Sequence, residues 1–315
     1  MTSSGSVDFD QTGNQIIKDA LVKISVIDSL EDPTASEMTG ARRQLNRMVK
    51  AWQTKGVHLW TRREAYLFVQ KSQAAYNIGP SSTEHTALIE DAVRTELSAD
   101  AASGASSISV DSTSGIAVSD NIGVVLDDNT IQWFTVSAIP GAITLSGTLS
   151  GAASTGNQVF AYTNKINRPL RLIDAQRTDD ADVDTPIIVF SHQEYQQTPN
   201  KTEDGKSNNI YYHPQRPQGV VYLWPRPETA ADRVRMTVEL PIEDFDATSN
   251  TPDFPTEWLD ALVYNLGARL IPDYAVPADV ASDVRMMAAE LFDDVLNWDV
   301  EEASTYFQPD MSATF

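Results

Sequence analysis

The chain has 315 residues, of which 41% are hydrophobic and 21% are charged, so it can bury a substantial core and form more than one domain. Its 44 acidic residues outnumber its 23 basic ones and give a formal net charge of -21. This charge argues against a protein that coats nucleic acid, because phosphate neutralisation needs clustered lysine and arginine. The absence of cysteine excludes disulfides, thiolate metal ligands and cysteine nucleophiles.

Two further properties concern where the protein is located and what its acidic surface does. No run approaches the roughly 20 apolar residues that a membrane helix needs, and residues 1–5 lack the basic and apolar regions of a signal peptide. We therefore expect a soluble protein made in the cytoplasm. The acidic charge serves solubility in one interpretation. In the other it provides a surface past which DNA moves without sticking, and composition does not choose between them.

The first two predicted elements are helices. Apolar residues recur at helical spacing over residues 14–30, and Pro33 then interrupts the helical pattern. Thr34 and Glu37 have the spacing of a capping box at the start of the second helix, and Gly56 stands where its C-terminal cap is expected. The apolar stripe of the second helix consists of Met38, Ala41, Leu45, Met48, Val49 and Trp52.

Four basic residues alternate with that apolar stripe, and they form the most basic stretch of an acidic protein. They are Arg42, Arg43, Arg47 and Lys50. One interpretation is a solvent-exposed face with ion pairs inside the helix. The other is an inter-subunit surface that contacts an acidic neighbour, such as another copy of this chain. The sequence leaves both interpretations open.

Extended structure follows the second helix. Residues 64–69 and 75–78 have the composition of strands, and Lys71-Ser72-Gln73 between them is typical of a hairpin turn. Ser191 and Glu194 form a second capping-box pattern, on a short helix. Pro225-Arg226-Pro227 predicts a stiff turn, because neither proline has an amide hydrogen. Further strands are predicted at residues 170–173, 187–190, 220–224 and 234–240.

A composition change near Ala99 marks an inserted region that is rich in Ser, Thr, Gly and Ala. Asp127-Asp128-Asn129 separates two of its β-prone runs in the manner of a hairpin turn. A low-complexity linker is the competing interpretation, but the regular alternation of strands and turns favours a small β-barrel or sandwich. The β-prone runs are residues 107–110, 122–126, 131–136, 143–145 and 159–162.

The C-terminal region is helical again, with one helix from about Thr256 and a longer one over residues 278–303. The last residues have no period, yet they hold Tyr306, Phe307 and Phe315, which a solvated tail would not need. We therefore predict an α+β fold with a helical bundle from the N- and C-terminal helices, a central antiparallel β region and an inserted small β-barrel or sandwich domain. The predicted segments are 1–57 (N-terminal helices), 58–98 with 164–250 (central β region), 99–163 (insert), 251–303 (C-terminal helices) and 304–315 (tail).

A search for catalytic or cofactor motifs finds none. The histidines, which are His58, His85, His192 and His213, have no zinc-binding spacing, and there is neither a phosphate-binding loop nor a nucleophile elbow. The acidic run 179–184 lacks the glycine and glutamate that an EF-hand requires, so we expect a solvated loop between strands. Trp133 is the candidate for an exposed stacking surface on the insert, although a half-buried strand tryptophan is the usual outcome. We predict no enzyme, no cofactor and no metal.

Four blocks of the sequence form a recognisable pattern when they are taken together and in order. The first block is residues 43–56 with 59–60 and 76–80. The others are residues 164–171, residues 210–214 with 219–227, and residues 254–270. In this order the blocks resemble podophage tail accessory factors, which are head-completion adaptors of the head-to-tail connector. The insert at 99–163 departs from the shortest members of that family.

The resemblance implies a structural subunit at the head–tail junction of a virion. Such a subunit forms a ring, expected to be a dodecamer, beneath the portal protein, and it continues the DNA channel towards a downstream tail or nozzle protein. DNA would pass through the lumen without specific binding, and no membrane is involved. A C-terminal extension grips the portal in such proteins, which makes Tyr306, Phe307 and Phe315 the portal-contact candidates. The alternative is a tail protein that binds or cleaves a surface glycan through Trp133 and Asp127 of the insert.

Overall fold

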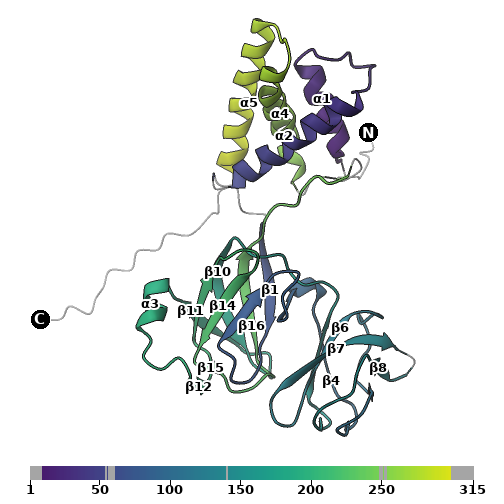
Figure 1. Cartoon of the computed structure of the whole chain (residues 1–315), viewed down its shortest axis with the longest axis vertical. Coiled ribbons are helices and arrows are strands. Elements are labelled where there is room, and N and C mark those ends of the chain that lie inside the picture. Colours follow the sequence, from purple (N-terminus) through teal and green to yellow (C-terminus); the bar gives the residue numbers. More distant parts are fainter. Residues whose placement is uncertain are drawn as a thin grey trace, which may run out of the picture. The chain divides into compact units, whose positions relative to one another are not determined.

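The computed structural model describes residues 9–53, 55, 61–139, 141–247, 251 and 254–298, and the chain divides into two compact units (Figure 1). The helical unit comprises Met1–Trp60 and Ile242–Phe315, and the β unit comprises Thr61–Pro241. The fold is α+β, as predicted. Among the described residues, no helix has the length and apolarity that would let it cross a membrane.

In the helical unit, helices from both ends of the chain share one apolar core. The α4 helix contacts α1, α2 and α5. Trp52 of α2 packs against Trp258, which lies directly before α4, and against Phe292 of α5, with ring centroids 5.8 and 4.9 Å apart. Segments far apart in the sequence are therefore tied together by aromatic packing. The helices are α1 (Gly13–Lys23), α2 (Ala35–Gln53), α4 (Leu259–Leu270) and α5 (Ala278–Trp298).

Local signals explain where these helices begin and end. The α1 helix stops at Lys23, earlier than the predicted residue 30, because Ser25 adopts a left-handed conformation (φ 59°). The capping box before α2 is confirmed: the Thr34 amide donates to a Glu37 carboxylate oxygen at 2.8 Å, and the Glu37 amide donates to Thr34 Oγ1 at 3.3 Å. The predicted cap at Gly56 and residues 299–303 of the last helix lie outside the described residues.

The β unit contains an eight-stranded sheet in the order β2-β14-β13-β11-β10-β16-β1-β3. Its two edge strands are joined only by residues 79–84, which reach roughly 25 Å, whereas a flat sheet of this size would be roughly 34 Å wide. The sheet therefore curls, and its concave face encloses an apolar core. The strands are β1 (Arg62–Phe68), β2 (Ala75–Ile78), β3 (His85–Leu88), β10 (Arg171–Thr178), β11 (Asp184–Val189), β13 (Asn209–His213), β14 (Gly219–Trp224) and β16 (Arg233–Glu239).

Two expectations about strand pairing were wrong. The turn at Lys71-Ser72-Gln73 exists, with the Gln73 amide donating to the Gln70 carbonyl at 3.2 Å, but β1 and β2 do not form a hairpin. Instead β1 pairs with β16 and β3, and β2 pairs with β14. The region is also not wholly antiparallel, since β11 and β13 pair in parallel. These partners lie far along the chain, so no local turn signal could reveal them.

The insert forms a six-stranded sheet in the order β4-β9-β6-β7-β8-β5 around its own core. An antiparallel bridge between Leu97 and Val110 joins the ends of the two edge strands, so the sheet closes on itself. The insert begins at β4, a few residues before the composition change at Ala99. The predicted turn between β6 and β7 is present, and Asn129 has φ 66°. The strands are β4 (Val93–Glu96), β5 (Ser107–Ile108), β6 (Asn121–Val125), β7 (Ile131–Ala138), β8 (Ile143–Leu145) and β9 (Gln158–Tyr162).

Three short elements complete the β unit. The helix α3 (His192–Gln197) starts at the predicted capping box, in which the Ser191 side chain accepts a hydrogen bond from the Glu194 amide. Strands β12 (Asp204–Gly205) and β15 (Arg226–Pro227) pair in parallel, so the stiff turn at residues 225–227 itself forms part of a small sheet.

Candidate interaction surfaces

The four basic residues predicted on α2 divide into two pairs. Arg42 and Lys50 are half-buried and bind the segment that leads into the C-terminal helices. Arg42 Nη1 donates to the Asp246 carbonyl at 3.3 Å, and Lys50 Nζ lies 2.8 Å from Asp244 Oδ1. These two side chains therefore have partners within the same subunit.

Asn46 lies between Arg42 and Lys50 on α2 and completes this contact. Its side-chain oxygen accepts a hydrogen bond from the Phe245 amide at 2.9 Å, and its side-chain nitrogen donates to the Phe245 carbonyl at 3.3 Å. The amide thus pairs with the backbone as a neighbouring strand would. This role of Asn46 was not predicted, because an asparagine in a helix gives no pattern that identifies its partner.

Arg43 and Arg47 form the second pair, and both are exposed. They lie one turn apart on the α2 face opposite the buried Leu45 and Met48. Neither forms an ion pair with a residue in the part of the chain that the structure describes. Of the four basic residues, these two are therefore the ones that still fit the predicted inter-subunit surface.

Trp133 of β7 lies at the junction between the insert and the eight-stranded sheet. The imidazole of His85 stacks on its ring with centroids 3.8 Å apart and planes inclined by 4°. Phe68 contacts it edge-on, with centroids 5.3 Å apart. One ring face is therefore covered, and a sugar could use that face only by displacing His85. The glycan-binding alternative would therefore have to use another part of this side chain or of the insert surface.

His85 itself is held in the neutral form. Its Nδ1 lies 2.6 Å from the Tyr162 hydroxyl, and burial, followed by the charge of Lys165, lowers its pKa to about 3. Burial also raises the pKa of Tyr162. An imidazole and a phenol that both stay neutral suit a packed junction between two sheets. The positions of His85, Trp133 and Tyr162 in the sequence gave no indication that these side chains are in contact.

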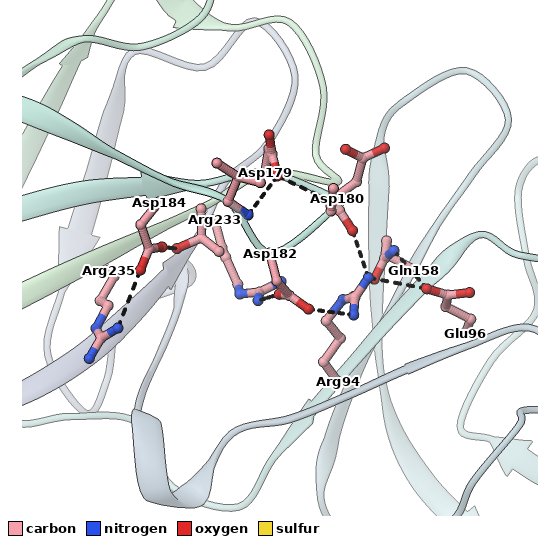
Figure 2. Close-up of polar contacts among 12 residues, drawn as sticks. Arg94, Glu96, Gln158, Asp179, Asp180, Asp182, Asp184, Arg233 and Arg235 are labelled. Atoms are coloured by element: carbon pink, nitrogen blue, oxygen red, sulfur yellow. Dashed lines mark hydrogen bonds and ion pairs between the residues drawn. The ribbon is translucent and has the colours of Figure 1, made fainter.

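The acidic run 179–184 leads from β10 into β11 and is exposed at residues 180–184, as expected of a solvated loop, and it also contacts this junction. Figure 2 shows Asp182 between the guanidinium groups of Arg233 from β16 and Arg94 from β4. Arg94 Nη1 lies 2.9 Å from an Asp182 carboxylate oxygen, and Arg94 Nη2 donates to the Asp180 carbonyl at 2.7 Å. The turn thus links a strand of the insert to a strand of the larger sheet.

Arg233 is the most buried charge of this network, with 6% of its side chain exposed. Its guanidinium carbon lies 5.0 Å from the ring centroid of Tyr66 and 5.7 Å from that of Phe160, which come from the two different sheets. Asp184, at the end of the same acidic run, contacts Arg235 at 3.4 Å. Asp182 and Asp184 therefore serve as counter-charges for strand arginines.

A third cluster joins two histidines that are remote in sequence. His192 Nδ1 lies 3.0 Å from the Tyr211 hydroxyl, and His213 Nδ1 lies 3.2 Å from the same oxygen. Tyr195 of α3 stacks on Tyr211, with centroids 5.4 Å apart. The cluster packs α3 onto the sheet. Among the described residues, no group of three or more histidine, aspartate or glutamate side chains is placed to hold a metal ion.

Three of the predicted candidates cannot be placed. Tyr306, Phe307 and Phe315 lie outside the described residues, as does His58.

No family model matches the chain, and no curated protein matches it. Among solved structures, it is similar to VP17, a capsid protein of bacteriophage P23-77, at 11% sequence identity over 61% of this chain and 73% of that chain. The TM-score is 0.12, at which the similarity does not establish a shared fold.

Proposed function

We propose that this chain is a structural subunit of a bacteriophage head-to-tail connector. In this role, copies of the chain, twelve in the proposed assembly, form a ring beneath the portal protein at the head–tail junction of the virion. The ring continues the DNA channel and offers the attachment site for a downstream tail or nozzle protein. The subunit is made in the host cytoplasm and acts without catalysis.

The observation that carries this proposal is the set of four ordered sequence blocks that resemble tail accessory factors. In the fold, these blocks fall on the framework of both units and not on the insert. The described part of the first lies on α2 and on β2 with the residues after it, the second leads into β10, the third spans β13 to β15, and the fourth covers Trp258 and α4. The resemblance therefore involves the residues that build the two units, and it leaves the role of the insert unassigned.

The charge of the chain supports the same proposal. Each subunit contributes a net charge of -21, and a ring multiplies this excess by its copy number. An acidic lumen repels DNA phosphate and keeps the duplex mobile during packaging and ejection. The aromatic tail with Tyr306, Phe307 and Phe315 is the proposed contact to the portal, because aperiodic segments with aromatic residues suit ordering on a partner.

Native mass spectrometry of the purified chain, with and without purified portal rings, tests the proposal. We expect a complex in which one ring of this chain occupies each portal ring. Removal of residues 304–315 should weaken that complex while the circular dichroism spectrum of the subunit stays unchanged. A full-length chain that binds no portal at any concentration would contradict the proposed function, and undiminished binding of the shortened chain would refute the role of the tail.

A further inference from the structure

The outward face of α2 carries an unusual combination of residues. Ser36, Gly40, Arg43 and Arg47 follow one another at spacings of four, three and four residues, so they form one stripe along the helix. A side chain added at Gly40 would meet nothing within 4 Å. Glycine inside a helix is unfavourable relative to alanine, and no neighbour among the described residues requires it there. Close approach of another molecule would require it.

The outward face of α5 has the opposite charge. Asp279, Asp283, Glu290 and Asp293 lie on it and are all exposed. None of them forms an ion pair with another described residue. Met286 lies in the middle of this acidic face and is 62% exposed. This face therefore combines carboxylates with one apolar side chain, and a basic surface with room for Met286 would complement it.

The two faces cannot satisfy each other within one subunit. Both helices pack on α4 with their apolar sides, and Arg43 and Arg47 make no contact with the acidic residues of α5. A contact between α2 of one copy and α5 of the next uses two different surfaces of the same chain. Such a heterologous contact repeats from copy to copy and closes into a ring when the rotation permits.

We infer that the stripe of Ser36, Gly40, Arg43 and Arg47 on α2 docks against the acidic face of α5 on a second copy of this chain. The two arginines pair with the α5 carboxylates, and Gly40 lets the helices approach closely around Met286. This inference rests on the proposed connector ring and names the contact between its neighbouring subunits. It also separates the four basic residues by role, since Arg42 and Lys50 bind within their own subunit.

Cysteine cross-linking tests the contact directly, because the natural chain contains no cysteine. Ser36→Cys is combined in one chain with Ser282→Cys, Ala289→Cys or Asn297→Cys. These three positions sample both ends and the middle of α5, so the test works whether the two helices run parallel or antiparallel, and none of the changes alters a charge. Under mild oxidation on portal rings, at least one pair should give a ladder of covalent oligomers. Each single-cysteine variant, and Ser36→Cys with Ser137→Cys on the β unit, should give no ladder.

Charge reversal provides the second test. Arg43→Glu with Arg47→Glu, or Asp283→Lys with Glu290→Lys, should weaken assembly on portal rings at least about tenfold. All four changes in one chain should restore it. Arg285→Glu, which alters a charge beside the acidic face, is the matched control and should assemble normally.

The outcomes separate the two proposals. If the unaltered chain assembles on the portal, but the reversed variants assemble equally well and no cysteine pair gives a ladder, the inferred contact is overturned and the connector function stands. If the unaltered chain never assembles, both are contradicted. A ladder together with restoration by the fourfold variant establishes the contact.

Discussion

At the scale of single residues, the ion pair between Arg233 and Asp182 is unequal. The Arg233 side chain is 6% exposed, whereas that of Asp182 is 51% exposed. Removal of the carboxylate leaves a buried cation without its counter-charge, and removal of the arginine leaves a carboxylate that water and Arg94 still stabilise. The two partners should therefore differ in their effect on stability.

We predict that Asp182→Asn lowers the free energy of unfolding of the β unit by about 2–4 kcal/mol. Asparagine tolerates the left-handed backbone at this position (φ 59°), so the turn is kept. Arg233→Met should cost less, and the double variant should be more stable than Asp182→Asn alone. Urea denaturation of the three variants checks this order, and an equal loss from either single change would contradict it.

A second residue-scale prediction concerns pH. The pKa of His85 is about 3 in the fold and about 6.5 in an unfolded chain. Below pH 6.5 the unfolded state binds a proton that the folded state does not, so His85 lowers stability as the pH falls from 6.5 towards 3. The loss is about 1.4 kcal/mol for each pH unit in that window.

His85→Gln should remove this part of the pH dependence, measured as the slope of the free energy of unfolding between pH 6 and pH 4. His192→Gln, which replaces a histidine outside this junction, is the matched control for the substitution. The account of His85 fails if its replacement leaves the slope unchanged.

Residue patterns in the sequence predicted contacts only where both partners are close along the chain. The capping boxes at Thr34 and Ser191 were predicted because each depends on two residues three positions apart. The role of Asp182 was missed, since its partners Arg94 and Arg233 come from strands on either side of it in sequence. His85 and Trp133 were considered separately for the same reason.

At the scale of elements, two glycines with different surroundings should respond oppositely to alanine. A Cβ on Gly123 of β6 would lie 2.8 Å from Trp133 ring carbons and from Ile131 Cδ1. Because His85 stacks on that tryptophan, Gly123→Ala should destabilise the β unit by about 1–3 kcal/mol. Gly40→Ala meets open space on α2 and should stabilise the helical unit by about 0.5–1 kcal/mol. Differential scanning calorimetry of both variants measures the direction of each change in unfolding temperature. A change in the same direction in both variants would contradict this packing.

Elements were predictable to the extent that their signals were local. The predicted strand at residues 131–136 corresponds to β7, and the predicted start of the last helix at residue 278 corresponds to α5. The hairpin between β1 and β2 was wrong because strand pairing depends on partners such as β14 and β16. The acidic face of α5 was overlooked, since only the fold shows which of its residues remain uncovered.

At the scale of the whole molecule, the sequence predicted the α+β class and an inserted region of strands, but composition alone placed the boundary of the insert after β4. The pairing of β4 with β9 places it in the insert's sheet. The proposed function depends on contacts between several copies of the chain and with the portal. The proposed connector role therefore rests on the resemblance and the acidic charge, and the inferred contact between the α2 and α5 faces would give its ring a specific interface.

A cryo-electron microscopy reconstruction of assembled virions tests the central claim most directly. We predict density for this chain in a closed ring directly beneath the portal, with the α2 stripe of each copy against the acidic face of α5 on its neighbour. Density for the chain in the capsid shell or at a tail tip, or no density for it at the head–tail junction, would contradict the proposed function.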